Sequence, residues 1–327
     1  MINMDDSFLV TGALGCIGAW VVRNLVQAGT PVAVFDLASD PHRLRLIMQP
    51  DEVARVRFIT GDVTDLAAFQ KGLADCGATH LIHLAALQVP FCRADPPLGA
   101  RVNVVGTVNA FEAAKRAGLK RLVYASSFAV YGLSEEYPEG RVTDDAPLRP
   151  NNHYGVYKQA NEGTARIYWQ DDGLASLAFR PYTVYGPGRD QGMTSTPTKA
   201  MLAAAAGQRY HISFGGRGLY QYADDVAKAF IQAARAPFSG SEVYNLHGSG
   251  AHMSEIVAAI EAASPESRGR ITFEEKPLAL PGDAEPAHLP EVLGALPETS
   301  LTEAVAQTIE VFKSALAEGR LAAPVAA

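Results

Sequence analysis

The sequence predicts an α/β fold: a doubly wound parallel sheet with a smaller, mixed C-terminal region. Three observations lead to this prediction. Short apolar runs alternate with helical patterns over the first 180 residues, the first run leads into three glycines spaced three apart, and an acidic residue ends the second run. Such alternation is typical of right-handed βαβ units, whose parallel sheet is covered by helices on both faces.

Composition limits the classes of protein to consider. The chain has 327 residues, 48% of them hydrophobic and 19% charged, with a net charge of −7. This length predicts about two domains. Because no Lys/Arg run is present, we expect neither a nucleic-acid nor a membrane-surface partner. No apolar run reaches the ~18 residues that span a bilayer.

The cysteines and the N-terminus indicate the compartment. Cys16, Cys76 and Cys92 are odd in number and scattered, which fits a reducing cytoplasm, and no pair has zinc-ligand spacing. The acidic start, residues 1–6, lacks the features of a signal peptide. We expect a cytoplasmic protein without a metal site.

The first strand and helix are joined by a glycine turn. Residues 8–11 form an apolar run, Gly12, Gly15 and Gly18 follow, and a helical pattern continues to Gly29. A turn of this kind lets backbone N–H groups approach a pyrophosphate at a helix N-terminus, where the macrodipole favours negative charge. The pattern therefore predicts a dinucleotide site.

The second strand, residues 31–36, ends in Asp36, 18 positions after the last glycine. A carboxylate there can accept two hydrogen bonds from a ribose diol and would repel a 2′-phosphate. We therefore predict NAD rather than NADP, although Arg43 and Arg45 lie nearby and favour the opposite preference.

Strands three to five add further cofactor candidates. Residues 57–60 lead to Asp62 and Val63, where an adenine could lie, although Asp62 fits a turn or helix cap equally well. Residues 79–86 end in small side chains, which allow a ligand to approach closely. A helical stretch, residues 96–118, contains Asn103, whose amide needs a partner in a ligand or a buried structural bridge. The fifth strand, from residue 121, ends at Ser126 and Ser127, at the sheet edge where open α/β sheets bind ligands.

The second half of the chain is less regular. A helix over 154–172 and a strand over 176–180 complete the first domain, and a surface loop over 134–152 is expected to cover the site. Further helices are predicted over 197–207, 222–236, 254–262 (capped by Ser254) and 301–318, and strands over 242–246 and 271–275. We divide the chain into an NAD-binding Rossmann domain over 1–180, rejoined by about 220–250, and a substrate-binding region over 181–219 and 251–327.

Tyr154 and Lys158 carry the predicted chemistry. They are four residues apart and share a helix face. A free phenol has a pKa near 10, and lowering it by about three units needs roughly 4 kcal/mol, which a nearby ammonium and a nicotinamide cation can supply. Tyr154 would then remove a proton from a secondary alcohol while a hydride leaves for the nicotinamide, and Ser127 would hydrogen-bond the same oxygen. Lys158 could also bond a ribose hydroxyl.

Together these motifs resemble the extended short-chain dehydrogenases/reductases, and specifically the NAD-dependent epimerase/dehydratase family. The matching stretches are residues 11–18, Asp36, 61–63, 83–86, 103–107, 126–127, 131–132, Tyr154 with Lys158, 180–187 and, less densely, 222–226. The resemblance implies a catalytic set of Ser127, Tyr154 and Lys158. It also implies a homodimer through a four-helix seam formed by the helices around 100–115 and 153–170.

Motifs and resemblance together give the expected cofactor contacts. The NAD-binding residues are predicted to be Gly12, Leu14, Gly15, Cys16, Ile17, Gly18, Asp36, Asp62, Val63, Leu84, Ala85, Ala86, Asn103, Tyr154, Lys158 and Pro181.

Departures from the family pattern narrow the reaction. Dehydratases and decarboxylases of the family place acids directly after the catalytic Ser/Thr, where this chain has Phe128 and Ala129. Nucleotide-sugar epimerases usually carry an Arg where this chain has Gly218 and another shortly before a late Pro-Gly-Asp, where this chain has residues 278–280, Leu-Ala-Leu. An apolar residue cannot neutralise a diphosphate. Thr183 also replaces an Asn that is frequent in nucleotide-sugar enzymes.

These departures lead to a ranked set of hypotheses. The first is an NAD-dependent dehydrogenase or epimerase acting on a sugar or sugar acid without a nucleotide handle. The alternative is a UDP-sugar 4-epimerase that uses Arg217 for the missing arginine, and a third is a non-catalytic dinucleotide sensor. The predicted substrate residues are Gln88, Ser127, Phe128, Thr183, Arg189 and Arg217.

Overall fold

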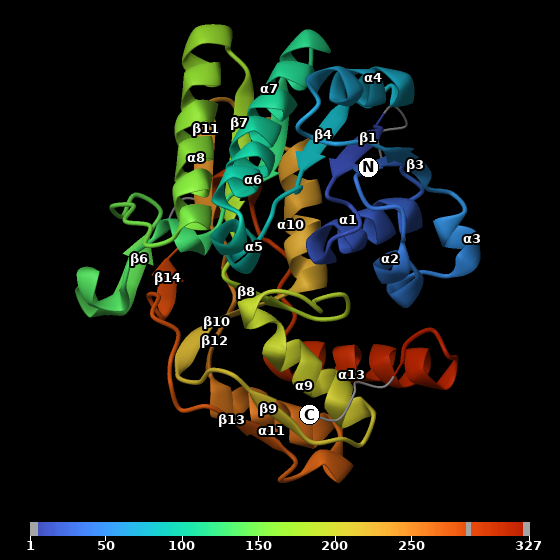
Figure 1. The fold of residues 1–327 in the computed structure, drawn as a ribbon, viewed down its shortest axis with the longest axis vertical. Helices are drawn as coiled ribbons and strands as arrows, with labels where there is room; N and C mark the ends of the chain where they lie inside the picture. The colour runs from blue at the N-terminus through green and yellow to red at the C-terminus, as the bar shows by residue number, and fades with distance from the viewer. Residues whose placement is uncertain (1–5, 286–288, 323–327) are drawn as a thin grey trace.

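The computed structural model describes residues 6–285 and 289–322, so most of the N-terminal stretch examined for a signal peptide lies outside it. A seven-stranded parallel sheet forms the larger part of the molecule (Figure 1), in the order β11-β7-β5-β4-β1-β2-β3. Its strands are β1 (Phe8–Thr11), β2 (Val32–Asp36), β3 (Arg57–Thr60), β4 (His80–His83), β5 (Arg121–Ala125), β7 (Ala175–Arg180) and β11 (Ser241–Asn245). The order reverses direction at β1 and β4, which creates a crevice at the carboxyl ends of the strands.

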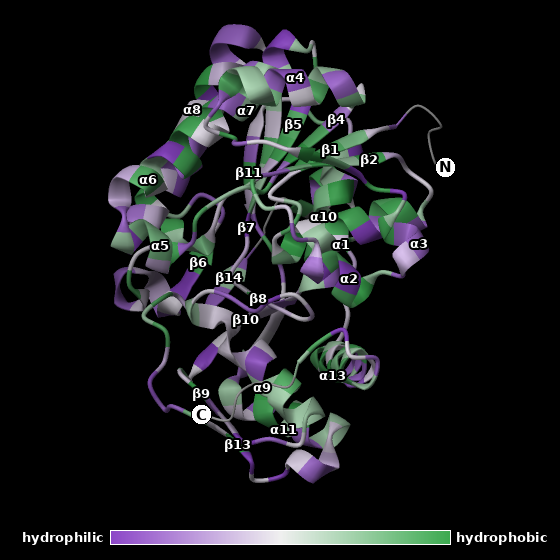
Figure 2. Cartoon of the chain, turned by 45° about the vertical axis from the view of Figure 1, so that its right-hand side comes forward, coloured by the Kyte–Doolittle hydropathy of each residue, from purple (hydrophilic) through white to green (hydrophobic). Residues whose placement is uncertain are grey.

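Helices cover both faces of this sheet, as the alternation of apolar runs predicted. One face carries α1 (Cys16–Gln27), α2 (His42–Ile47), α3 (Pro50–Val53) and α10 (Ala223–Arg235); the other carries α4 (Leu66–Cys76), α7 (Gly106–Arg116) and α8 (His153–Asp172). Separate hydrophobic clusters fill the two interfaces, and Figure 2 shows the hydrophobic strand β1 between the helices of the two layers. The sheet and its helices thus form a rigid base for the strand ends.

The second region lies beyond the carboxyl ends of the strands (Figure 1) and has its own core. Its small sheets are β12 (Ser249–His252) with β10 (Arg217–Tyr222) and β8 (Thr183–Tyr185), and β13 (Ile271–Phe273) with β9 (Tyr210–Ile212). Its helices are α9 (Thr196–Ala205), α11 (Met253–Ala263) and α13 (Leu301–Ala317). Because β8 starts three residues after β7 ends, the chain passes from one region to the other at the crevice itself.

The structure differs from the sequence-based elements in several places. The expected helix over 96–118 is divided into α6 (Pro96–Ala100), a π-helical turn (Arg101–Val105) and α7. Helix α11 is capped by the side chain of His252, which accepts from the Ser254 N–H, so Ser254 lies inside the helix. The loop expected over 134–152 contains β6 (Arg141–Thr143), which pairs with β14 (Asp283–Glu285) and buries Tyr137 and Val142.

The C-terminal segment is shared between the two cores. Leu289 and Leu293 of α12 (Leu289–Leu293) pack in the cluster that covers the large sheet, whereas α13 packs on α11 and α9. The described residues after β12 therefore contribute to both cores. No described helix has both the length and the apolarity needed to cross a bilayer.

Candidate active site

A cavity of about 870 Å³ runs along the carboxyl ends of the large sheet. Residues that follow β1, β2, β3, β4, β5 and β7 line one side of it, and residues 189–194 and 278–280 line the other. It lies where an open α/β sheet binds its ligand, at the point where the strand order reverses.

Most of the predicted site residues meet in this cavity. The lining includes the predicted cofactor residues Gly12, Leu14, Gly15, Cys16, Ile17, Gly18, Asp36, Asp62, Val63, Leu84, Ala85, Ala86, Tyr154, Lys158 and Pro181. It also includes the predicted substrate residues Gln88, Ser127, Phe128, Thr183 and Arg189. The structure brings these side chains together, and what each of them contacts stays a prediction. Asn103 and Arg217 do not line the cavity.

The glycine turn has the form that a pyrophosphate requires. Gly12 has a φ of +63°, and a Cβ there would lie 2.5 Å from the Ala85 backbone nitrogen. A Cβ on Gly18 would lie 2.5 Å from the Gly12 carbonyl oxygen. Helix α1 then starts with no side-chain cap on its first N–H groups. These unpaired donors at the positive end of a helix fit an anionic group of the cofactor.

Asp36 is oriented for a ribose. Its two carboxylate oxygens accept the Leu14 and Ala38 backbone N–H groups, each at 3.0 Å. Because each oxygen has a second acceptor position, the carboxylate can still receive two hydroxyl groups. Asp62 lines the cavity and also has the turn role considered above, since it accepts the Thr64 N–H at 2.8 Å.

Asn103 forms a buried structural bridge, and its predicted contact with the cofactor stays a prediction. The side chain is fully buried in the π-helical turn. Its amide nitrogen donates to the Leu87 carbonyl at 3.0 Å, and its oxygen accepts the Leu87 N–H at 2.9 Å. Both groups are therefore satisfied by the loop that follows β4, and Asn103 holds this loop in place.

Arg217 lies outside the cavity lining, and its predicted contact with the substrate stays a prediction. Successive side chains of a strand point to opposite faces, so Arg217 and Gly218 of β10 cannot substitute for one another. Gly218 faces Tyr182, whose ring carbon would lie 3.3 Å from a Cβ at that position, whereas the Arg217 guanidinium lies beside Gly250. Arg217 is exposed and points away from the cavity.

The catalytic candidates lie on α8 and after β5. Asn152 caps α8 by accepting the Gly155 N–H at 3.0 Å, which fixes the first turn that carries Tyr154. Ser127 lines the cavity together with Tyr154, and its hydroxyl accepts the Ala129 N–H at 3.1 Å. The Lys158 Nζ lies 5.7 Å from the centre of the Tyr154 ring and donates to the Ala125 carbonyl at 2.7 Å. Hydroxyl, phenol and ammonium thus converge on one end of the cavity.

The electrostatics of this group differ from the expectation. Burial raises the pKa of Tyr154, and the Ser127 hydrogen bond and the Arg189 charge lower it by less. Lys158 is itself desolvated, which lowers its pKa to about 8, and its ammonium is directed to the Ala125 carbonyl. In the enzyme alone, Lys158 therefore does not lower the pKa of the phenol as predicted. When bound, NAD supplies the hydride acceptor and the positive charge of its nicotinamide ring.

The depressed pKa of Lys158 predicts a dependence of stability on pH. The pKa falls from 10.5 in the unfolded chain to about 8, so the folded state binds fewer protons between these values. The free energy of unfolding of the cofactor-free wild type should therefore rise across this window by about 3 kcal/mol relative to Lys158→Met. Urea unfolding of both proteins at a series of pH values measures this difference, and a pH-independent difference would contradict the prediction.

Beneath these groups lies a buried ion pair that the sequence argument missed. The Arg180 guanidinium donates to both carboxylate oxygens of Glu162, at 2.9 and 2.8 Å. Glu162 also accepts the Ser126 hydroxyl, and Arg180 donates to the Tyr131 hydroxyl at 2.6 Å. The pair ties α8 to the ends of β5 and β7. Glu162 lies four residues after Lys158, so helical spacing alone could have placed it on the same face.

Fold and site together define a dinucleotide-dependent enzyme with a Ser–Tyr–Lys set. Residues 8–246 match the model of the NAD dependent epimerase/dehydratase family. The chain belongs to this family, and its cofactor is NAD. This membership favours the enzyme hypotheses over the non-catalytic sensor. Among the described residues, no cluster of three or more His, Cys, Asp or Glu side chains could hold a metal ion.

Relatives cover nearly the whole chain. The UDP-glucose 4-epimerase of Mycolicibacterium smegmatis is 32% identical over 94% of this chain and 98% of its own length. The structure of MoeE5 in complex with UDP-glucose and NAD is 30% identical, covers 95% of this chain and 99% of its own, and has a TM-score of 0.77. The UDP-glucose 4-epimerase of Thermus thermophilus, in complex with NAD, is 27% identical over 94% of this chain and 99% of its own, with a TM-score of 0.79.

Proposed function

We propose that this enzyme is an NAD-dependent 4-epimerase of a nucleotide sugar. The observation that carries the proposal is the extent of the likeness to UDP-glucose 4-epimerases. It includes the second region, whose residues 278–280 close the cavity opposite the sheet. The comparisons thus favour the UDP-sugar 4-epimerase, which the sequence offered as the alternative. They favour it over a dehydrogenase or epimerase of a sugar without a nucleotide handle, which the sequence placed first.

The residues at the catalytic end have a role in this reaction. Tyr154 accepts the proton of the ring hydroxyl as the hydride leaves the same carbon, and Ser127 hydrogen-bonds the oxygen as it becomes a carbonyl. Return of the hydride to the opposite face of the keto group gives the epimer, with Tyr154 donating the proton back. Phe128 and Ala129 carry no acid or base beside Ser127, which disfavours an elimination step.

A second candidate is a dehydrogenase of a sugar or sugar acid without a nucleotide. The specific observation in its favour is the contact of Gly218 with the ring of Tyr182. A long cationic side chain at position 218 would have to displace this ring, and Arg217 points to the opposite face of the strand. Leu278 and Leu280 add apolar side chains to the lining in the same region. Arg189 lines the cavity and would be a cation available to a diphosphate.

One experiment separates the two candidates. The purified holoenzyme is incubated with UDP-glucose, and the sugar nucleotides are separated by chromatography. A parallel series contains NAD and a panel of free sugars and sugar acids, with the absorbance of NADH as the readout. We expect UDP-galactose without net NADH. Accumulation of NADH with a free sugar or sugar acid, and no UDP-galactose, would overturn the epimerase in favour of the second candidate.

Two further expectations from the sequence stay proposals. A homodimer through α7 and α8 would cover Val105, beside α7, and Val156 and Ile167 on α8, all of which are exposed. A cytoplasmic location would suit Cys16, Cys76 and Cys92, which are all free.

A further inference from the structure

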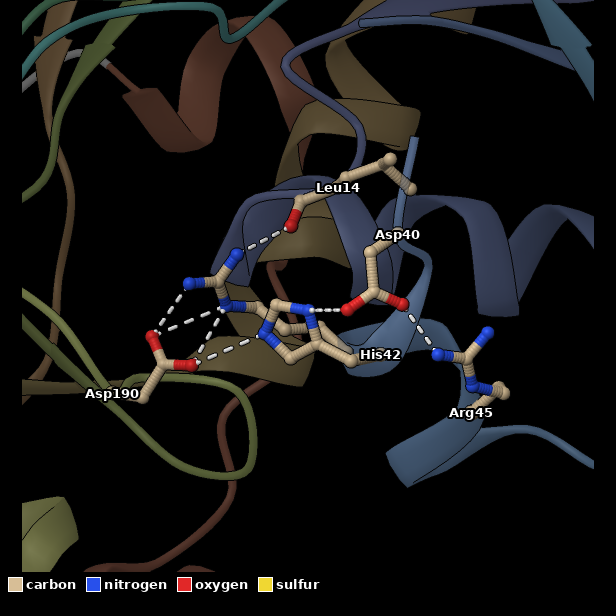
Figure 3. A network of polar contacts seen from close by, with 6 residues as sticks. Leu14, Asp40, His42, Arg45 and Asp190 are labelled. Carbon is tan, nitrogen blue, oxygen red and sulfur yellow. Dashed lines mark hydrogen bonds and ion pairs between the residues drawn. The ribbon is translucent and has the colours of Figure 1, made fainter. Parts of the chain in front are cut away.

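An ion pair joins the two sides of the cavity at the glycine turn. The loop over 186–194, between β8 and α9, reaches the N-terminal end of α2, and Figure 3 shows Asp190 of this loop beside His42. The Arg43 guanidinium donates from Nε to both carboxylate oxygens of Asp190, at 3.2 and 3.1 Å, and from Nη2 to one of them at 2.7 Å. This planar, two-sided geometry gives the stronger and more directional form of an ion pair.

Arg43 connects this loop to the cofactor cradle as well. Its Nη1 donates to the Leu14 carbonyl at 2.7 Å, while the Leu14 N–H donates to Asp36. One guanidinium therefore holds the glycine turn and the loop together. A second contact supports the same closure, since the Trp20 indole N–H of α1 donates to the Pro187 carbonyl at 2.9 Å.

The Arg43 end of the pair is buried, unlike the neighbouring pair of Arg45 and Asp40. The Arg43 side chain is 13% exposed and lines the cavity, and its partner Asp190 is 46% exposed, whereas Arg45 and Asp40 are 55% and 64% exposed. Exposed pairs of the second kind contribute little, because water and salt screen them. The His42 ring lies between the two carboxylates, 3.3 Å from Asp40 and 3.5 Å from Asp190. The Arg43–Asp190 contact is thus the part of the network in Figure 3 that can hold the loop.

The residues next to the pair face the ligand side. Arg189 precedes Asp190 and lines the cavity, with a buried Nε that has no partner among the described residues. The charges of Arg189, Arg43 and Asp190 all act on Cys16, in the first turn of α1. Asp190 itself does not line the cavity. The loop therefore directs the Arg189 side chain into the cavity, toward the glycine turn. The next side chain, Asp190, lies outside the cavity and binds Arg43.

We propose that Arg43 and Asp190 form a strap that retains NAD on the enzyme between turnovers. A dinucleotide on the glycine turn lies between the two segments that the strap joins, so its release requires the loop to separate from α2. The inference rests on the NAD site and not on the identity of the substrate. An epimerase returns the hydride from its cofactor to the keto form of the substrate, so it needs to retain that cofactor. A dehydrogenase must instead exchange its cofactor.

The test is the rate at which NADH leaves the enzyme. The full chain is loaded with NADH and mixed rapidly with excess NAD, and the fluorescence of bound NADH is followed. Asp190→Asn keeps the size of the side chain, lies outside the cavity and removes the charge. We expect it to release NADH at least about tenfold faster than the wild type, since bidentate charge-assisted pairs are the strong ones. The control Asp40→Asn should stay within about twofold, as exposed pairs do.

A double-mutant cycle tests whether the two residues act as one contact. Arg43→Lys keeps the charge and loses the planar fork, so it should also speed release. Because Arg43 also binds the Leu14 carbonyl, the cycle measures only the part of its effect that depends on Asp190. If the strap is the cause, Asp190→Asn speeds release much less in the Arg43→Lys background than in the wild type. Wild-type release from Asp190→Asn, or additive effects in the double variant, would overturn the proposal. Neither result depends on which sugar the enzyme converts.

Discussion

Replacing Tyr154 by phenylalanine should abolish turnover and leave folding and NAD binding nearly unchanged. The substitution removes one hydroxyl, which belongs to a residue that lines the cavity together with Ser127 and Lys158. A positioned acid–base group contributes about 10²–10⁴-fold to a rate, so kcat should fall by about three orders of magnitude. Steady-state kinetics give the activity, and titration with NADH gives the affinity for the cofactor.

Tyr157→Phe is the matched control for this variant. Tyr157 lies three residues further along the same helix, and its hydroxyl donates to the Pro96 carbonyl at 2.9 Å, outside the cavity. Losing this one hydrogen bond should cost about 1 kcal/mol of stability and little activity. Full activity of Tyr154→Phe, or an equal loss of kcat in the two variants, would contradict the role of Tyr154 as the acid–base group.

Arg180→Leu should have the largest effect on stability. Arg180 is 4% exposed and Glu162 is 9% exposed, and the leucine would leave the carboxylate buried with the Ser126 hydroxyl as its remaining side-chain donor. Removing one partner of a buried ion pair costs about 3–5 kcal/mol. We expect a loss of this size in the free energy of unfolding, measured in urea, with activity lost in parallel because Ser127 follows Ser126.

The double variant Arg180→Leu/Glu162→Leu separates loss of the pair from loss of packing. It leaves no buried charge, and replacing a whole buried pair by apolar side chains is frequently close to neutral. It should therefore be more stable than Arg180→Leu alone. If the free energy of unfolding of Arg180→Leu is within about 1 kcal/mol of the wild-type value, the network does not hold α8 to the strand ends.

The large sheet could be predicted because its inner strands, such as β1 and β7, are buried on both faces. Such strands are continuous apolar runs, and each glycine or acid that follows one lies at the same edge of the sheet. The order of β1, the glycine turn and Asp36 along the chain was therefore enough to place the cofactor cradle. The small strands β8, β10 and β12 escaped prediction, since each has three to six residues and pairs with a segment distant in sequence.

Spacing along the sequence did not show that two of the predicted site residues, Asn103 and Arg217, lie outside the cavity lining. Asn103 has the residue type of a ligand contact, but its partner is the Leu87 backbone, 16 residues away, which no local pattern reveals. Arg217 is adjacent to Gly218, yet β10 directs it to the opposite face, and the strand itself was not predicted. The strap between Arg43 and Asp190 was missed for a related reason, because its partners are 147 residues apart.

In the proposed reaction, a hydride moves from a carbon of the substrate to NAD and back on the same enzyme. The most direct test uses UDP-glucose deuterated at C4, with mass spectrometry of the sugar nucleotide products and of the cofactor. We expect UDP-galactose that retains the deuterium at C4, with no transfer to added free NAD. Loss of the deuterium to solvent, or a product whose configuration at C4 is unchanged, would contradict the transfer of the hydride to NAD and back.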